Sequence, residues 1–204
     1  MYMTIGGYPD KVPAEYLIPP DVFESDEPFS RFYNVASKLG LDTFDLAGGA
    51  IVDDFTGDGY LDIVTSSMDM NGQMRFFRNN QDGTFSNFTS KTRLDRVLMA
   101  MGCNFGDLDN DGFLDCYIGT GEPDLRALVP NRMFRNNRGE FFQDVTTSGG
   151  FGHLQKGHGV AFGDIDNDGD QDIYAVMGGA YSGDRFQNVL FENPGNDNHW
   201  ITLR

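Results

Sequence analysis

The sequence predicts an all-β fold made of about three four-stranded antiparallel blades, that is, part of a β-propeller. Three observations support this class. An acidic nine-residue motif occurs three times, at spacings of 53 and 57 residues. The residues after each copy are mainly β-branched or aromatic, which favours strands. Each repeating unit holds four short strand candidates, as propeller blades do. An open β-sandwich or a calcium-repeat solenoid would be the alternative, although nonapeptide solenoid repeats are far shorter.

The chain divides into three parts. Residues 1–31 are predicted to be an irregular leader, since prolines interrupt any long helix or central strand. Residues 32–193 are predicted to hold the three repeats, and residues 194–204 follow them. In the middle repeat the strand candidates lie at about 102–106, 113–119, 131–136 and 140–145, and the acidic motif connects the first two.

The acidic motif has the spacing of a cation-binding loop. In its third copy, residues 164–172, acidic residues stand at every second position and a glycine stands sixth. A hard cation such as Ca²⁺ takes six to eight oxygen ligands at roughly 2.3–2.6 Å. Side chains at positions 1, 3, 5 and 9 can converge on such an ion, and position 7 can add its carbonyl. The glycine permits the positive φ of a sharp turn.

The other two copies, residues 107–115 and 54–62, keep this pattern, except that Thr56 replaces the acid at position 3. One copy could be an acidic turn that arose by chance. Chance does not explain three copies in register. They are not EF-hands, which need a glutamate at position 12 between two helices. The twelfth residues here are Thr65, Ile118 and Ala175.

The composition restricts the partners. The net charge is −16 and the pI about 4.3, which makes nucleic acid and anionic membranes poor partners. Three bound Ca²⁺ ions would offset six of these charges; a marine or halophilic source is another explanation. No apolar run reaches the roughly 18–20 residues of a membrane span. The first residues lack a signal-peptide pattern, so either the protein is not exported or this chain is part of a longer one.

Two cysteines, Cys103 and Cys116, flank the second motif. Two are too few for a disulfide scaffold. On antiparallel strands they could lie opposite each other and form a disulfide, or they could be two buried free thiols. The sequence leaves both possibilities open.

Several motifs together resemble FG-GAP/VCBS repeats, the integrin-α-type propeller repeats. They are Asp-x-Asp-Asn-Asp-Gly-x-x-Asp, the preceding segment 160–164, and Asn-x-Leu/Met-Phe-Arg/Glu-Asn. The ending, residues 190–204, resembles the junction into an ASPIC/UnbV domain, as in the cartilage acidic protein family. The resemblance implies a seven-bladed propeller in the parent protein, an extracellular, cell-surface or periplasmic location, and calcium between the first and second strands of a blade.

The resemblance also implies about three Ca²⁺ sites with these ligands. Site 1 would use Asp54, Thr56, Asp58, Asp62 and the Tyr60 carbonyl; site 2 would use Asp107, Asp109, Asp111, Asp115 and the Phe113 carbonyl; site 3 would use Asp164, Asp166, Asp168, Asp172 and the Asp170 carbonyl. A threonine hydroxyl is a weaker ligand than a carboxylate, so we expect lower affinity at site 1.

The predicted function is a non-catalytic, calcium-binding module for protein or glycan recognition and cell adhesion. The alternatives are a purely structural scaffold for a neighbouring domain and a fragment of a carbohydrate-active enzyme. Paired carboxylates could serve glycoside hydrolysis, with His153 or His158 as a base. However, the aspartates are already assigned as metal ligands, and no Gly-x-Ser-x-Gly or phosphate-binding loop is present.

The partner is predicted to bind on the face opposite the acidic loops. The loops between the second and third strands are long in the last two repeats, and with the inter-repeat connections they bring together Arg126, Lys156, Tyr181 and Arg185. Arginine suits carboxylate or sulfate groups, and a tyrosine can stack on a sugar. Solvated loop charges are the plainer explanation. We also expect exposed blade edges to associate or to pack on a further part of the chain.

Overall fold

The computed structural model describes residues 2, 7–27, 30, 32–71, 74–96 and 98–198. The chain divides into two compact units, Met1–Val35 and Ala36–Arg204. The described part of the first unit holds two 3₁₀ helices, η1 (Ala14–Tyr16) and η2 (Pro20–Phe23), and no strand. Prolines stand at the start of both helices, where their fixed φ is favourable.

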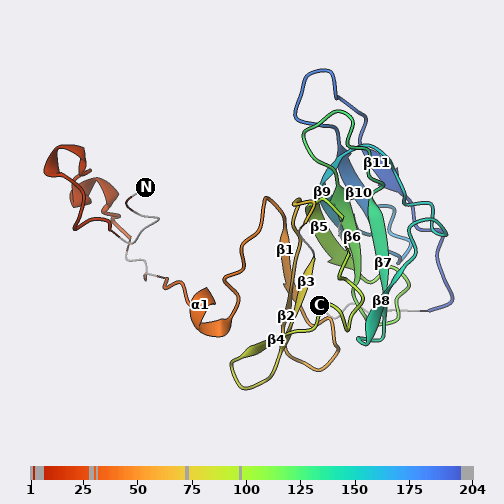
Figure 1. Cartoon of the computed structure of the whole chain (residues 1–204). Coiled ribbons are helices and arrows are strands. Elements are labelled where there is room, and N and C mark those ends of the chain that lie inside the picture. Colours follow the sequence, from red (N-terminus) through yellow and green to blue (C-terminus); the bar gives the residue numbers. More distant parts are fainter. Residues whose placement is uncertain are drawn as a thin grey trace. The chain divides into compact units, whose positions relative to one another are not determined.

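The second unit begins with one helical turn, α1 (Ala36–Leu39), and continues as antiparallel sheets (Figure 1). Blade 1 contains β1 (Ala50–Asp53), β2 (Asp62–Thr65), β3 (Arg75–Asn79) and β4 (Phe85–Asn87); blade 2 contains β5 (Ala100–Gly106), β6 (Asp115–Thr120), β7 (Arg132–Asn137) and β8 (Phe141–Asp144); blade 3 contains β9 (Gly157–Gly163), β10 (Asp172–Met177) and β11 (Val189–Phe191). The predicted all-β blade architecture is confirmed. Blade 3 has three strands within the described residues.

Each acidic motif connects the first two strands of its blade, as predicted. We call the connections loop 1 (54–61), loop 2 (107–114) and loop 3 (164–171). In every blade the residue before the loop pairs with the ninth-position aspartate across the ladder: the pairs are Asp53 with Asp62, Gly106 with Asp115, and Gly163 with Asp172. The three loops are therefore equivalent in register as well as in sequence.

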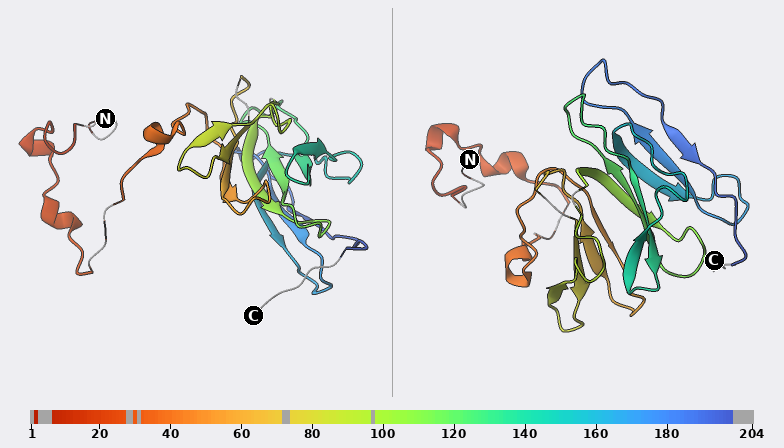
Figure 2. Two further views of the ribbon diagram at one scale, coloured as in Figure 1. Left: turned by 90° about the horizontal axis from the view of Figure 1, so that it is seen from below. Right: turned by 45° about the vertical axis from the view of Figure 1, so that its right-hand side comes forward.

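The core consists of two layers, one on each side of blade 2, and Figure 2 shows the sheets side by side. Cys116 and Ile118 on β6 face blade 1 and join Phe55, Val64 and Phe76 there. Tyr117, between them in sequence, points to the opposite face and packs against Ile173 and Ala175 of blade 3. Successive side chains of a strand point to opposite faces, so a central blade must be apolar on both.

The two cysteines lie on neighbouring strands of blade 2, β5 and β6. Cys103 lies opposite Ile118 and Cys116 lies opposite Phe105, and both thiols are free. Burial raises the pKa of each thiol, which favours the protonated form.

Among the described residues, no helix has the length and apolarity needed to cross a membrane.

The limits of the three sequence segments stay predictions. The compact unit that holds the blades begins at Ala36, and the described residues 32–35 form no strand. Of the ASPIC/UnbV-like ending, residues 199–204 lie outside the described residues.

Candidate metal centre

The first aspartate of each acidic loop fixes the loop backbone. In loop 2, Asp107 accepts hydrogen bonds from the backbone N–H groups of Asp111 (3.0 Å) and Gly112 (2.9 Å). Loops 1 and 3 repeat these bonds: Asp54 accepts from Asp58 (3.0 Å) and Gly59 (2.7 Å), and Asp164 accepts from Asp168 (3.1 Å) and Gly169 (3.2 Å). The carboxylate thus organises its own loop before any ion is considered.

Two positions of each loop adopt left-handed backbone conformations, and this explains the residue types found there. The sixth residue is always glycine, with φ of 86°, 89° and 102° in Gly59, Gly112 and Gly169. The fourth residue also has positive φ, and it is Gly57, Asn110 or Asn167. Glycine and asparagine tolerate this region best. The turn itself therefore accounts for glycine or asparagine at position 4 and for glycine at position 6 of the motif.

The structure brings the acids at positions 1, 3 and 5 together. In loop 2 each of Asp107, Asp109 and Asp111 offers a carboxylate oxygen within 4.8 Å of the others, and in loop 3 Asp164, Asp166 and Asp168 do the same. The oxygens are of the kind that Ca²⁺ prefers. Asp109 also has a buried oxygen, Oδ1, with no hydrogen-bond partner among the described residues. Loops 2 and 3 therefore fit a hard cation, whereas loop 1 has only two of these acids.

The ninth-position aspartates, Asp62, Asp115 and Asp172, are nearly fully buried and lie outside these clusters. In loop 2, Asp115 accepts the N–H of Leu108 (3.1 Å) with one oxygen and the N–H of Asn136 (2.8 Å) with the other. Burial raises the pKa of Asp115 to about 7 despite these bonds, and it also raises the pKa values of Asp62 and Asp107. The structure thus shows a backbone-anchoring role for this position, and its ligand role stays a prediction.

The seventh residues, Tyr60, Phe113 and Asp170, follow the left-handed glycine. The acid at position 5 accepts their N–H groups at 3.1, 3.0 and 2.9 Å. These bonds fix the backbone at the position where we predict a carbonyl ligand. The carbonyl coordination itself remains a prediction.

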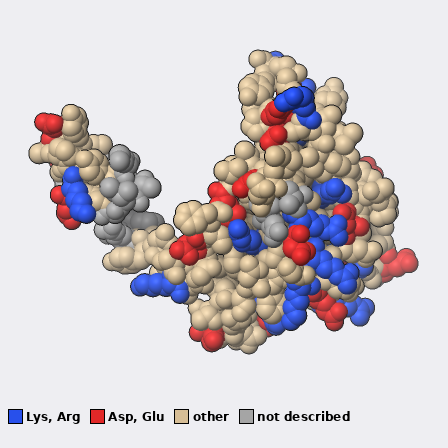
Figure 3. All heavy atoms as spheres, viewed as in Figure 1, with Lys and Arg blue, Asp and Glu red and all other residues tan. Residues whose placement is uncertain are grey.

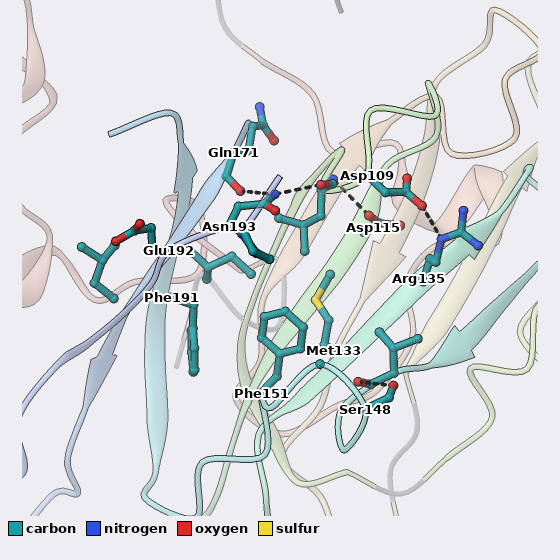
Figure 4. Close-up of a pocket in the computed structure, with 16 residues that line it drawn as sticks. Asp109, Asp115, Met133, Arg135, Ser148, Phe151, Gln171, Phe191, Glu192 and Asn193 are labelled. Carbon is teal, nitrogen blue, oxygen red and sulfur yellow. Dashed lines mark hydrogen bonds and ion pairs between the residues drawn. The ribbon is translucent and has the colours of Figure 1, made fainter. Parts of the chain in front are cut away.

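The counterions of the acidic clusters differ between blades, which sequence reasoning missed. In blade 2, Arg135 on β7 bonds through Nε to Asp109 (Figure 4) and through Nη2 to Asp111 (3.1 Å). In blade 1 the equivalent residue, Arg78, bonds through Nη2 to Asp58 (3.1 Å). In blade 3 the equivalent residue is Glu192. The signal was the repeated Phe-Arg/Glu-Asn triplet on the third strand, 57 residues apart.

The asparagine of this triplet links neighbouring blades. Asn136 donates its side-chain amide to the carbonyl of Leu114 in its own blade (3.1 Å) and to that of Phe55 in loop 1 (2.9 Å). Asn193 does the same with Gln171 (3.1 Å) and with Leu108 in loop 2 (2.8 Å) (Figure 4). Loop 2 is thus fastened both to its own third strand and to blade 3, and loop 1 is fastened to blade 2.

The groove beside these contacts, between blades 2 and 3, has a volume of about 580 Å³. Its apolar part is formed by Met133, Phe151 and Phe191 (Figure 4).

The predicted partner-binding residues occupy different environments. Arg126 and Tyr181 lie together in a shallow depression of about 470 Å³, formed where the β6–β7 and β10–β11 loops run side by side (Figure 1). Arg185 lines a second depression with Phe186. Lys156, in contrast, is 1% exposed, and its Nζ pairs with Asp184 at 2.7 Å. Lys156 therefore holds the β10–β11 loop rather than facing solvent.

Fold, repeated loops and blade contacts together define a β-propeller-type repeat protein. Comparison with known proteins agrees: residues 54–118 and 119–175 match the FG-GAP-like repeat. The chain belongs to the FG-GAP-like repeat family, which confirms the resemblance noted in the sequence.

Among curated proteins the chain is similar to Cartilage acidic protein 1 of Xenopus tropicalis, with 28% identity over 165 residues. The match covers 79% of this chain and 22% of the relative. The chain therefore spans about a fifth of the length of that relative.

Proposed function

We propose that this chain is a calcium-binding, non-catalytic propeller module that acts outside the cell and binds a protein or glycan partner. The observation that carries the calcium proposal is the pair of clusters Asp107/Asp109/Asp111 and Asp164/Asp166/Asp168, held in loops of the same geometry. The extracellular location draws on the repeat family and on the relative named above.

Calcium would act mainly through stability. Three carboxylates at close range repel one another without a cation, so an ion that binds only the folded loop shifts the folding equilibrium. The ion would be held by the acids at positions 1, 3 and 5 of loops 2 and 3. Loop 1, with Thr56 in place of an acid, would bind it more weakly.

Calorimetric titration of the chelator-treated protein tests this proposal. We expect tight binding at two loops and weaker binding at a third, and we expect Mg²⁺ to substitute poorly because it demands a strict octahedron. Three equal affinities would contradict the argument about Thr56. No heat of binding, together with an unchanged melting temperature in EDTA, would remove the calcium proposal.

A non-catalytic role is supported by how the possible acid–base groups are used. The acids of the loops accept backbone N–H groups and, in blades 1 and 2, bond to arginine. His158 contacts the Gly178 carbonyl through Nε2 (2.6 Å), and His153 accepts the N–H of Gln155 (3.1 Å). Both histidines are therefore already engaged in holding loops. A hydrolysis assay on a panel of polysaccharides tests the alternative of a carbohydrate-active enzyme.

The partner is proposed to bind at the paired long loops, through Arg126, Tyr181 and Arg185, since rigid scaffolds commonly display binding residues on loops. A glycan and anionic-polymer array compares the parent with Arg126→Ala/Arg185→Ala. Lys38→Ala/Arg96→Ala removes the same charge elsewhere and is the control. Equal binding by the parent and the first variant would exclude this site. No ligand for any of them would favour the scaffold alternative.

A further inference from the structure

One arginine contact present in blade 2 is missing from blade 1. Arg135 uses Nε for Asp109 at position 3 and Nη2 for Asp111 at position 5. Arg78 keeps the second of these contacts, with Asp58. The first is lost because position 3 of loop 1 is Thr56, whose side chain offers no carboxylate.

One polar atom of this contact is buried and unsatisfied. It is Nε of Arg78, which has no hydrogen-bond partner among the residues that the structure describes, while the Thr56 side chain lies beside the Asp62 carboxylate. A buried charged donor without an acceptor is unfavourable, and natural structures keep few of them. In blade 2 the equivalent atom, Nε of Arg135, bonds to the carboxylate of Asp109.

A pocket of about 440 Å³ is lined by Thr56 and Arg78. Its lining includes three cationic side chains, Arg78, Lys91 and Arg138, and one acid, Glu140. Two of the cations make cation–π contacts with Phe88: Lys91 Nζ lies 4.4 Å and Arg78 Cζ lies 5.6 Å from the centre of its ring. On a chain with a net charge of −16, this lining has three cationic residues and one acid, and Figure 3 shows lysines and arginines interspersed with acids on one face of the blades.

The wall of the pocket is built by specific backbone geometry. The β7–β8 turn of blade 2 approaches loop 1 so closely that a Cβ on Gly139 would lie 2.5 Å from the Thr56 carbonyl oxygen. Gly139 has φ of 74° and donates its N–H to Asn136 Oδ1 (2.9 Å). The turn also presents Arg138, with φ of 54°, to the pocket. Blade 2 therefore supplies part of a site that centres on blade 1.

We propose that this pocket binds a carboxylate, which occupies the place that position-3 aspartates hold in the other loops. Arg78 would bond to it through Nε, as Arg135 does to Asp109, while Thr56 would donate its hydroxyl. Arginine forks suit planar carboxylates. Asp54 and Asp58, at positions 1 and 5 of the loop, would repel the bound anion, whereas Arg78, Lys91 and Arg138 would attract it. The repulsion is larger for a doubly charged oxyanion. A carboxylate therefore fits better than sulfate or phosphate.

The test uses the whole chain, labelled with ¹⁵N, in EDTA, so that it is independent of the proposed calcium binding. The Nε–Hε resonance of Arg78 and the backbone N–H resonances of Thr56 and Gly139 are followed during titration with sodium acetate. Sodium chloride and sodium sulfate at equal ionic strength are the reference salts. We expect saturable shifts with acetate that exceed those with either salt. Shifts no larger than with chloride, or equal shifts with sulfate, would overturn the proposal.

A second pair of probes identifies the source of the carboxylate. N-acetyl-glutamate amide carries the carboxylate of a protein side chain, and N-acetyl-glutamine amide is its uncharged match. Binding of the first but not the second supports recognition of an acidic side chain. Binding of acetate alone supports a small free acid. Equal binding of both amides would show that the carboxylate is not what the pocket recognises.

The decisive variant is Thr56→Asp, which gives loop 1 the acid of loop 2 and should fold for that reason. We expect its new side chain to engage Arg78 and to weaken acetate binding at least about tenfold, the value of a charge-assisted hydrogen bond. Gln143→Glu adds the same charge on exposed β8 and is the matched control, with unchanged binding. Acetate binding by Thr56→Asp equal to that of the parent would refute the assignment.

Discussion

Blades 2 and 3 carry the same acidic motif and the same loop hydrogen bonds, yet their surroundings differ on two counts. Tyr117 of blade 2 is fully buried against blade 3, whereas its equivalent 57 residues later, Tyr174, is 41% exposed. The acids of loop 2 bond to Arg135, while the equivalent position beside loop 3 is Glu192. The loop motif thus sets the backbone, and the neighbours set burial and charge balance.

The two blades therefore differ in two sources of stability, namely apolar packing and an arginine that balances the charge of the acidic cluster. In blade 2 the packing is complete and an arginine neutralises part of the acidic cluster. In blade 3 the apolar face is open, and the cluster has no arginine at the equivalent position. We therefore expect blade 2 to tolerate loss of metal and blade 3 to depend on it. The following variants test the comparison, starting with the largest effect.

The largest difference should come from the two tyrosines. Tyr117→Ala removes a ring that is buried among Phe151 and Phe191, with centroid distances of 6.2 and 5.9 Å. Loss of a buried aromatic side chain costs about 3–5 kcal/mol of unfolding free energy. Tyr174→Ala should cost less than about 1 kcal/mol, since its face is open. Urea unfolding of both variants measures this, and equal losses would show that blade 3 is covered in solution.

The second expected effect is that calcium-dependent stability comes mainly from loop 3. At a free concentration of about 100 times its dissociation constant, one bound ion adds about 2.7 kcal/mol. Asp168→Ala should remove most of the stability difference between calcium and EDTA, whereas Asp111→Ala should remove less, because Arg135 already balances loop 2. Thermal melts in both conditions give this difference.

Asp95→Ala, an exposed acid outside the loops, controls for the change of charge. A larger loss of calcium-dependent stability in Asp111→Ala than in Asp168→Ala would reverse the proposed ranking of the two loops.

The sequence was sufficient to predict what depends on local geometry. The position-6 glycine of the motif, the β-branched flanks and the period of the repeat led to the strands and to the loops between them. Strand limits in blade 2 are within about two residues of those expected: the predicted 113–119 is Asp115–Thr120. The clustering of acids at positions 1, 3 and 5 follows from alternation along a tight loop, which is also a local property.

What the sequence could not show depends on contacts between blades. Nothing local distinguishes Lys156, which is buried and paired with Asp184, from an exposed lysine such as Lys91. The ninth-position aspartates look like ligands in sequence, but their burial at the start of a strand gives them backbone N–H partners. The role of Arg78 and Arg135 required the register of the third strand against the loop.

The third expected effect is an exchange of counterions. Glu192→Arg would place a guanidinium beside loop 3, as Arg135 lies beside loop 2. It should raise stability in EDTA and lower the calcium-dependent part by up to about 1 kcal/mol, the range of partly exposed ion pairs. Glu192→Gln separates the loss of a negative charge from the gain of a guanidinium. If both variants behave alike, repulsion by Glu192, rather than a missing arginine, distinguishes the loops.

The smallest expected effect is association through the open face of blade 3. Leu190 on this face is 52% exposed, whereas its equivalent Met133 is 1% exposed and packs on the next blade. At the opposite end, Val52 of blade 1 is 51% exposed, whereas its equivalent Phe105 packs against blade 1. The occupant that fits each face is therefore another blade of the same type.

Between separate copies such a contact is head-to-tail and does not close at two subunits. Sedimentation over a concentration series should show weak, progressive association rather than one dimer. Tyr174→Lys/Leu190→Lys should abolish it, and Leu154→Lys, at an equally exposed site elsewhere, should not; association that persists in the double variant would mean that this face is not the contact.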